Sequence, residues 1–327
     1  MRRIKVRIFL LFVALGLAPI VAPGFAKASE TKQAVDVAIY VIDISEVQEL
    51  QQSVVADFVI IARWHQDDLE DPDAPELRIF SLDQVDSPRL FVINARRLRE
   101  KFGTSVEVDR TGQALLRQRY QGTLSVPMDL RNFPMDVQTF EIAVGTLDYR
   151  GRKLVADPRR SGAMQSFTVA GWRVEPVALE SGELMAPDGN HYYSTITAVY
   201  TAERNGLFFA WKLFIPLGLI VLMAYAVFWL DPTALSTQIG IATSTVFTLI
   251  AYNFALSSIL PQISYLTRAD LYMIGCMLLV FGALGEAVIT GVLARKETHL
   301  ALARRIDLIA RFVYPAIYAI VIFVAFF

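Results

Sequence analysis

Hydroxyl-bearing and aromatic side chains recur along one face of an otherwise apolar segment at residues 232–267. If this segment is a helix, alternating steps of four and three residues place one stripe together: Gly240, Ser244, Phe247, Ala251, Phe254 and Ser258. Around a central axis, Ser244 would solvate a passing ion, and rings of Phe247 and Phe254 would form constrictions that close by dewetting. The spacing is equally typical of a seam between helices joined by Ser and Thr hydrogen bonds.

Residues suited to catalysis or metal binding are scarce. Cys276 is the single cysteine and there are three histidines, so the sequence supplies neither an intrachain disulfide nor a Cys/His zinc site. It also lacks Gly-x-Ser-x-Gly, His-Glu-x-x-His and a phosphate-binding glycine loop. We therefore expect a protein that is not an enzyme and that uses no cofactor or metal ion.

Composition and charge favour a membrane protein with two unlike parts. The chain has 327 residues, of which 54% are hydrophobic and 19% charged, and its mean hydropathy is +0.42. A net charge of −1 argues against a nucleic-acid partner. Residues 29–206 hold 27 acidic and 19 basic side chains (net −8), whereas residues 207–327 hold 5 and 7 (net +2). The two parts are expected to face different environments.

The start of the chain has the order of a secretory signal. Basic residues at 2–7 precede an uncharged apolar run at 8–26 and an Ala-x-Ala sequence at 26–28. This order predicts a cleaved signal peptide over residues 1–28, with a retained anchor helix as the alternative. The remainder of the chain is exported in either case.

Residues 29–206 are predicted to form one all-β domain. Their dominant period is two, in short runs rich in β-branched and aromatic residues that Gly and Pro separate: residues 35–41, 57–64, 90–94, 139–144 and 193–200. No long helical period interrupts these runs. The pattern is typical of a β-sandwich.

Residues 207–327 are predicted to cross a membrane four times, because each of four apolar segments reaches the roughly 20 residues that a spanning helix needs. The segments lie at about 207–230, 235–259, 270–294 and 307–327. The third connection carries Arg295, Lys296, Arg304 and Arg305, and basic short loops mark the cytoplasmic side. The β domain and the C-terminus are therefore expected outside the cytoplasm.

From about residue 35 to the C-terminus, the chain resembles the bacterial pentameric ligand-gated ion channels of the Cys-loop receptor superfamily. The most specific match is the Phe-Pro-x-Asp motif at Phe133, Pro134 and Asp136. Val126 and Phe140 stand where animal receptors carry the two cysteines that bracket this motif. Weaker matches follow in the family's order: Val35-Asp36-Val37, Trp64, Ser87-Pro88, Arg204, Pro216, Phe228-Trp229-Leu230 and Leu260-Pro261.

The resemblance implies a homopentamer, in which each chain joins four identical subunits in the lipid bilayer of a bacterial inner membrane. The second apolar segment would then line a central pore, and alignment from Leu260-Pro261 adds Ser236 to the pore-lining stripe. Ser236 replaces the glutamate usual at the cytoplasmic mouth of cation-selective members. We still expect monovalent cations to permeate, because five acidic β domains would concentrate them near the outer mouth.

The resemblance also implies a ligand site between β domains that takes a small-molecule agonist or protons. The corresponding positions are Leu147, Asp148, Tyr149, His191, Tyr192 and Tyr193. In relatives, an aromatic cage at this site holds an amine by cation–π attraction. Leu147 replaces its central aromatic residue, which disfavours a quaternary amine and leaves a small amine, a carboxylate or a proton.

Gating is expected to pass through the junction between the two domains, with Phe133, Pro134, Asp136, Arg204 and Pro261 as the coupling residues. Asp136 and Arg204 are expected to form an ion pair there. The turn at residues 47–51 and the connection at 261–270 should join this contact.

Two points stay open at the level of sequence. Glu286, inside the third apolar segment, is either functional, or snorkels to the cytoplasmic surface, or meets Arg295. The main alternative function is a membrane-anchored β-sandwich receptor or adaptor whose four helices do not conduct.

Overall fold

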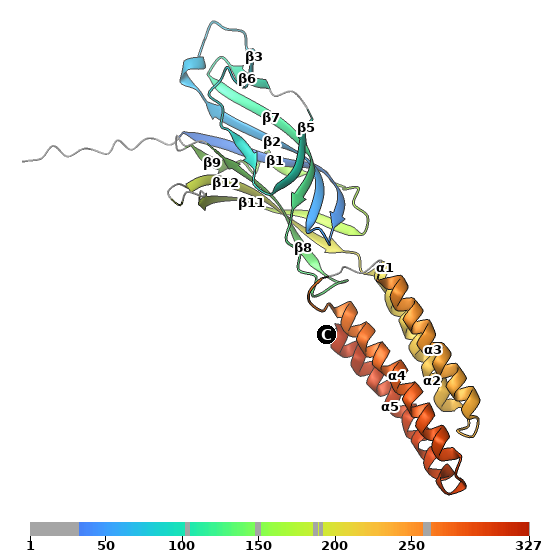
Figure 1. Ribbon diagram of the computed structural model, residues 1–327. Helices are drawn as coiled ribbons and strands as arrows, with labels where there is room; N and C mark the ends of the chain where they lie inside the picture. The colour runs from blue at the N-terminus through green and yellow to red at the C-terminus, as the bar shows by residue number, and fades with distance from the viewer. Residues whose placement is uncertain are drawn as a thin grey trace, which may run out of the picture. The chain divides into compact units, whose positions relative to one another are not determined.

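The computed structural model describes residues 33–101, 105–147, 152–185, 189, 192–257 and 263–326. The predicted signal peptide lies outside these residues. The described chain contains a two-sheet β-sandwich followed by four membrane-capable helices, which confirms the predicted fold class (Figure 1).

The larger sheet has the strand order β10-β1-β2-β7-β6-β3, with β5 also paired to β7 and β9 to β1. Its strands are β1 (Ala34–Gln48), β2 (Ser53–His65), β3 (Leu77–Ser81), β5 (Ala95–Glu100), β6 (Ser105–Asp109), β7 (Gln113–Ser125), β9 (Lys153–Ala156) and β10 (Gly162–Ala163). The smaller sheet has the order β11-β12-β8-β4. Its strands are β4 (Leu90–Val92), β8 (Val137–Thr146), β11 (Trp172–Met185) and β12 (Tyr192–Arg204).

The period-two pattern in the sequence corresponds to alternate burial along the strands, because successive side chains of a strand point to opposite faces. In β2, side chains at every second position are buried in the core between the sheets, namely Val54, Ala56, Phe58, Ile60, Ala62 and Trp64. Trp64 is only 2% exposed and is a packed core residue. Hydrophobic burial between the two sheets is therefore what holds the sandwich together.

Strand β7 is central to the larger sheet although its sequence is rich in Arg and Gln. Arg119 on this strand forms a bidentate pair with Asp57 on β2, with Nε and Nη2 donating to the two carboxylate oxygens at 2.9 and 2.8 Å. Alternate positions such as Leu116 and Leu124 fill the core. The polar face of β7 is thus stabilised by charge pairing rather than by burial.

The helical part begins with a composite span over Leu207–Trp229. It runs from α1 (Leu207–Phe209) through a π-helical turn (Ala210–Phe214) into α2 (Ile215–Ala226), and ends in a 3₁₀ turn (Val227–Trp229). The π turn ends two residues before Pro216, whose ring nitrogen has no hydrogen to donate to the preceding turn.

The remaining spans are α3 (Leu235–Leu256), α4 (Arg268–Ala294) and α5 (Leu300–Phe326), the last preceded by a 3₁₀ turn (Glu297–His299). Helix α5 begins at Leu300 and not near residue 307, as the apolar pattern predicted. The reason is that residues 300–305 combine Leu, Ala and Arg, which are strong helix formers even where the segment is too polar for lipid.

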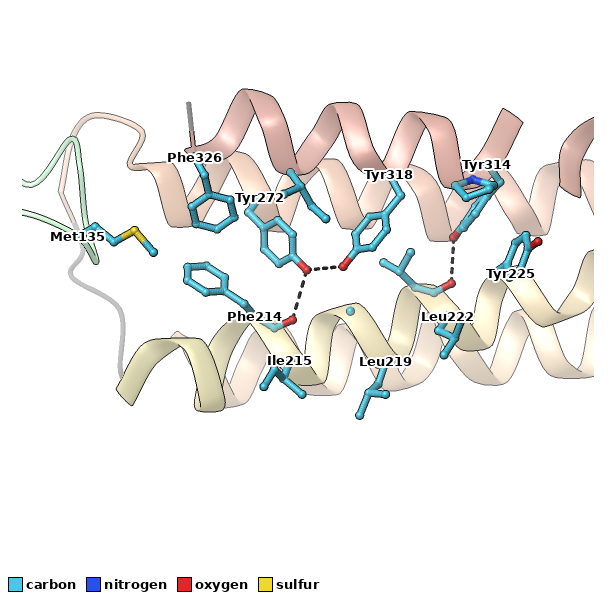
Figure 2. Close-up of a pocket in the computed structure, with 14 residues that line it drawn as sticks. Met135, Phe214, Ile215, Leu219, Leu222, Tyr225, Tyr272, Tyr314, Tyr318 and Phe326 are labelled. Carbon is cyan, nitrogen blue, oxygen red and sulfur yellow. Dashed lines mark hydrogen bonds between the residues drawn. The ribbon is translucent and has the colours of Figure 1, made fainter. Parts of the chain in front are cut away.

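Helices α2, α4 and α5 surround an apolar cavity of about 690 Å³ (Figure 2). The Tyr272 and Tyr318 hydroxyls lie 2.8 Å apart inside it, and Tyr272 also donates to the Phe214 carbonyl at 3.3 Å. Tyr314 donates to the Val221 carbonyl at 3.3 Å. These bonds satisfy hydroxyl groups that would otherwise lie unpaired in a hydrocarbon environment.

Glu286 does not snorkel to the surface. Both of its carboxylate oxygens are buried, and the group lies beside Asp307 of α5 rather than meeting Arg295. The sequence could not show this neighbour, because the register between α4 and α5 depends on how the two helices pack.

Gly122 on β7 is the most constrained glycine of the sandwich and supplies a test of the strand pairing. Its φ is +151°, and a Cβ would lie 1.9 Å from the Arg97 carbonyl oxygen of β5. We expect Gly122→Ala to lower the free energy of unfolding by more than about 3 kcal/mol, as measured by thermal unfolding. The reason is that the added Cβ would force the backbone of β5 and β7 apart.

Gly171→Ala is the matched control, since Gly171 has a φ of +79° but no atom within 4 Å of the Cβ that alanine would add. We expect Gly171→Ala to lower the free energy of unfolding by only about 1 kcal/mol, the cost of placing alanine in a left-handed backbone conformation. Equal losses in the two variants would contradict the β5–β7 packing.

Candidate functional site

Arg204 lies at the C-terminal end of β12, directly before the first membrane span, and its side chain is only 4% exposed. Its Nε donates to Asp136 Oδ1 at 2.7 Å, and Nη2 donates to Oδ2 at 3.3 Å. Asp136 comes from the Phe-Pro-x-Asp loop and is also buried. The expected Asp136–Arg204 ion pair is therefore present, in the bidentate geometry that favours arginine.

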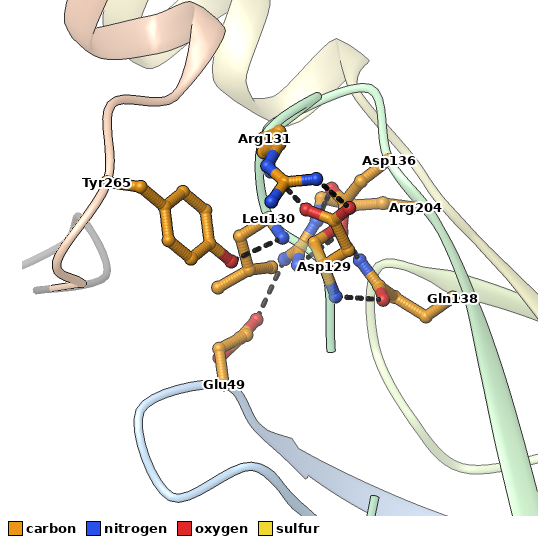
Figure 3. A network of polar contacts seen from close by, with 8 residues as sticks. All are labelled: Glu49, Asp129, Leu130, Arg131, Asp136, Gln138, Arg204 and Tyr265. Atoms are coloured by element: carbon orange, nitrogen blue, oxygen red, sulfur yellow. Dashed lines mark hydrogen bonds and ion pairs between the residues drawn. The ribbon is translucent and has the colours of Figure 1, made fainter. Parts of the chain in front are cut away.

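A second carboxylate completes the neutralisation of Arg204. Its Nη1 donates to Glu49 Oε1 at 2.8 Å, and Glu49 lies in the turn between β1 and β2 (Figure 3). Gln138 Nε2 donates to Asp136 Oδ2 at 2.5 Å and to the Asp129 carbonyl at 2.7 Å. One guanidinium thus joins three separate segments of the β domain.

Three aromatic rings surround the same guanidinium. Its central carbon lies 4.1 Å from the ring centroid of Trp172, 4.9 Å from that of Phe133 and 5.8 Å from that of Phe209. Trp172 begins β11, whereas Phe209 belongs to the first membrane span. Cation–π attraction therefore extends the Arg204 contacts from the sandwich into the helical part.

The Phe-Pro-x-Asp loop also contacts the connection before α4. The Leu130 N–H donates to the Tyr265 hydroxyl at 2.9 Å, and the Arg268 and Ala269 N–H groups donate to the carbonyls of Arg131 and Phe133 at 3.0 and 3.2 Å. Figure 3 shows Tyr265 approaching this loop. Movement of the loop would therefore be transmitted directly to the start of α4.

Helix α3 carries the predicted pore-lining stripe on an exposed face of the isolated chain. The described members Ser236, Gly240, Ser244, Phe247, Ala251 and Phe254 are all exposed. Phe247 and Phe254 are 67% and 75% exposed. The opposite face is buried and includes Gln238, Ala242, Thr245 and Leu249. Ser258 lies outside the described residues.

The predicted ligand positions are described only in part. Leu147 directly follows β8 and is 43% exposed, while Tyr192 is 65% exposed and Tyr193 is partly buried at the start of β12. The β8–β12 register, in which Gly145 is opposite Thr195, places these positions at the same end of neighbouring strands. Asp148, Tyr149 and His191 lie outside the described residues, as does the coupling residue Pro261.

Sequence reasoning missed the residues that enclose Arg204 and anchor the Phe-Pro-x-Asp loop, namely Trp172, Phe209 and Tyr265. A usable signal existed, because each is an aromatic residue within three positions of the start of a strand or helix. Their convergence on one loop depends on tertiary packing, which no spacing along the chain reports.

Two family models match the chain. The model for the neurotransmitter-gated ion-channel ligand binding domain matches residues 20–185, and the model for the neurotransmitter-gated ion-channel transmembrane region matches residues 213–302. The described fold agrees with this division into a β-sandwich and a four-helix membrane part. These matches identify the chain as a ligand-gated ion channel with an extracellular N-terminal domain.

The chain belongs to the neurotransmitter-gated ion-channel family, within the Cys-loop pentameric channel superfamily. Val126 and Phe140, which replace the bracketing cysteines, are 1% and 3% exposed. Both ends of the Phe-Pro-x-Asp loop are therefore held in the core by hydrophobic burial.

Removing Asp136 tests the buried ion pair. Asp136→Ala leaves a buried guanidinium with one carboxylate fewer, and the loss of one partner of such a pair costs about 3–5 kcal/mol. We expect a correspondingly lower unfolding temperature of the purified protein in detergent.

Glu203→Ala is the neighbouring control, because Glu203 forms an exposed pair with Arg173 at 3.8 Å. We expect a loss below about 1 kcal/mol for this variant. An Asp136→Ala protein as stable as the control would contradict the account of Arg204.

Proposed function

We propose that five copies of the chain assemble around an axis and that α3 of each copy lines a pore for monovalent cations. The observation that carries this proposal is the exposed α3 stripe, which is small and polar at one end and aromatic at the other. A face of this kind is too polar for lipid near Ser236 and Ser244, so it requires water or protein beside it. Family membership favours water, since the members are channels.

The proposed pore uses two kinds of chemistry. Ser236, Gly240 and Ser244 form a wide section in which hydroxyl groups replace part of an ion's hydration shell. Phe247 and Phe254 form two apolar rings that exclude water when the helices approach one another. Opening then requires only that these rings move apart enough to become wet.

Cation selectivity rests on charge outside the spanning segments. The β domain carries a net charge of −8 in residues 29–206 (27 acidic minus 19 basic), which raises the local cation concentration at the outer mouth. At the other end, hydrogen bonds from Thr233 hold the pKa of Asp231 below its ordinary value, and the nearby Arg304 acts in the same direction. Asp231 therefore stays ionised near the start of α3.

The proposed stimulus is a small-molecule agonist or a proton acting on the β domain of a channel in a bacterial inner membrane. Twisting of the sandwich would move the Phe-Pro-x-Asp loop against Phe209 and Tyr265, and so shift a closed–open equilibrium. Phe133, Pro134, Asp136, Arg204 and Pro261 would carry this coupling.

Current across a bilayer that contains the purified protein tests the proposal under asymmetric KCl, while the pH is stepped and small amines and carboxylates are applied. We expect gated current that reverses near the potassium equilibrium potential. Reversal near the chloride potential would contradict cation selectivity and leave the channel intact.

Phe247→Ala tests the hydrophobic gate. Without the ring, the constriction no longer dewets, so we expect leak current without a stimulus or a lower stimulus threshold. Phe312→Ala on α5 is the matched control, because Phe312 is similarly exposed (74% against 67%) on a different helix. The anchored-adaptor alternative instead predicts that both variants change only stability and that neither conducts.

A further inference from the structure

A histidine and two carboxylates converge where β2 ends and the connection to β3 begins. His65 is the last residue of β2, Asp67 opens the following 3₁₀ turn (Asp67–Leu69), and Glu70 comes directly after that turn. His65 Nε2 lies 2.9 Å from Asp67 Oδ1 and 3.3 Å from Glu70 Oε1. The three atoms all lie within 4.8 Å of one another. We refer to these three residues as the β2-end cluster.

The separations within the β2-end cluster are those of ligands on one metal ion. Nitrogen and oxygen ligands bind zinc at about 2.0–2.1 Å, so two neighbouring ligands lie roughly 2.8–3.4 Å apart in octahedral or tetrahedral geometry. Both distances from His65 Nε2 fall inside this range. An ion placed between the three atoms would therefore need only small side-chain adjustments to bind all of them.

Gly112, in the turn between β6 and β7, makes room for this convergence. Its φ is +74°, and a Cβ there would lie 2.9 Å from Glu70 Cγ and 3.3 Å from His65 Cε1. A side chain at this position would therefore crowd two of the three ligands. The Thr111 N–H donates to Asp109 Oδ1 at 2.8 Å in the same turn. The wall that faces His65 and Glu70 is thus held in place by its own hydrogen bond.

The carboxylates of the β2-end cluster are available to an ion from solvent. In the described part of the chain, both form ion pairs with His65 and with no arginine. Two arginines of the adjoining segments are engaged elsewhere. Arg78 Nη1 lies 3.9 Å from Asp71 Oδ2, and Arg110 Nε donates to the Ala74 carbonyl at 2.8 Å. Both cluster carboxylates are exposed, so an ion reaches them without opening the sandwich.

We propose that the β2-end cluster binds a zinc ion through His65 Nε2, Asp67 Oδ1 and Glu70 Oε1. A neutral imidazole and two carboxylates supply two negative charges, which balance those of Zn²⁺. The nitrogen ligand favours zinc over Ca²⁺ and Mg²⁺, which take oxygen ligands. The bound ion would tie the end of β2 to the first turn of the connection to β3. This site lies in the β domain and does not depend on conduction.

The expectation of no metal ion rested on the scarcity of Cys and His in the sequence. A site with one histidine and two carboxylates is outside the scope of that argument. The convergence also depends on the turn at Gly112, which lies more than forty residues further along the chain.

Equilibrium dialysis of ZnCl₂ against the purified full-length protein in detergent measures this binding, after metals have been removed with EDTA. We expect one zinc ion per chain to be lost in His65→Ala and retained in His299→Ala, which removes an exposed histidine outside the cluster. Asp67→Asn and Glu70→Gln should each weaken this binding at least about tenfold, because each removes an anionic ligand. All three cluster side chains are at least 40% exposed, so these variants are expected to fold.

Gly112→Ala is a second test, because it keeps all three ligands and displaces two of them. It should also weaken zinc binding. Equal zinc binding by the unaltered protein and by His65→Ala would overturn the proposal, because the cluster would then be an ion pair only. Displacement of the bound zinc by an equal concentration of CaCl₂ would overturn it as well, because the nitrogen ligand would then confer no preference.

Discussion

One buried guanidinium organises the junction between the two halves of this channel. Arg204 is enclosed by Asp136, Glu49 and three aromatic rings, so its charge is neutralised where water is excluded. These partners come from four segments, namely the turn at Glu49, the Phe-Pro-x-Asp loop, the start of β11 and, through Phe209, the first membrane span. Because an uncompensated charge at this depth is costly, these segments must keep their positions around it.

The β-sandwich and the helical part are stabilised by different interactions. The sandwich depends on core burial between its sheets, supplemented by charge pairs such as Arg119–Asp57. The helical part has no hydrophobic driving force in lipid, so it relies on close packing and on tyrosine hydroxyls that bond to neighbouring helices. Helix α3 departs from both patterns, because its exposed face mixes hydroxyl groups with phenylalanine. The proposed water-filled axis would account for that mixture.

The sequence predicted the elements with strong patterns and missed those that packing decides. Period-two runs located β1, β2, β4, β8 and β12, whereas the Arg- and Gln-rich β7 and the long strand β11 were not identified. Apolar length located four spans but not the polar first turns of α5. At the junction, the Asp136–Arg204 pair followed from a family motif, while the ring cage and Tyr265 required the folded chain. Glu286 met Asp307 rather than Arg295 for the same reason.

The central claim is that the β domain controls the pore through contacts of the Phe-Pro-x-Asp loop, and the Tyr265 hydroxyl is the smallest such contact that can be deleted. Once a stimulus is known, its half-maximal concentration should be compared in Tyr265→Phe and in Tyr40→Phe, whose hydroxyl donates to Met164 within the sandwich. We predict a several-fold shift in Tyr265→Phe, with unchanged open-channel conductance and no shift in the Tyr40→Phe control. Identical half-maximal concentrations in both variants and the unaltered protein would contradict it.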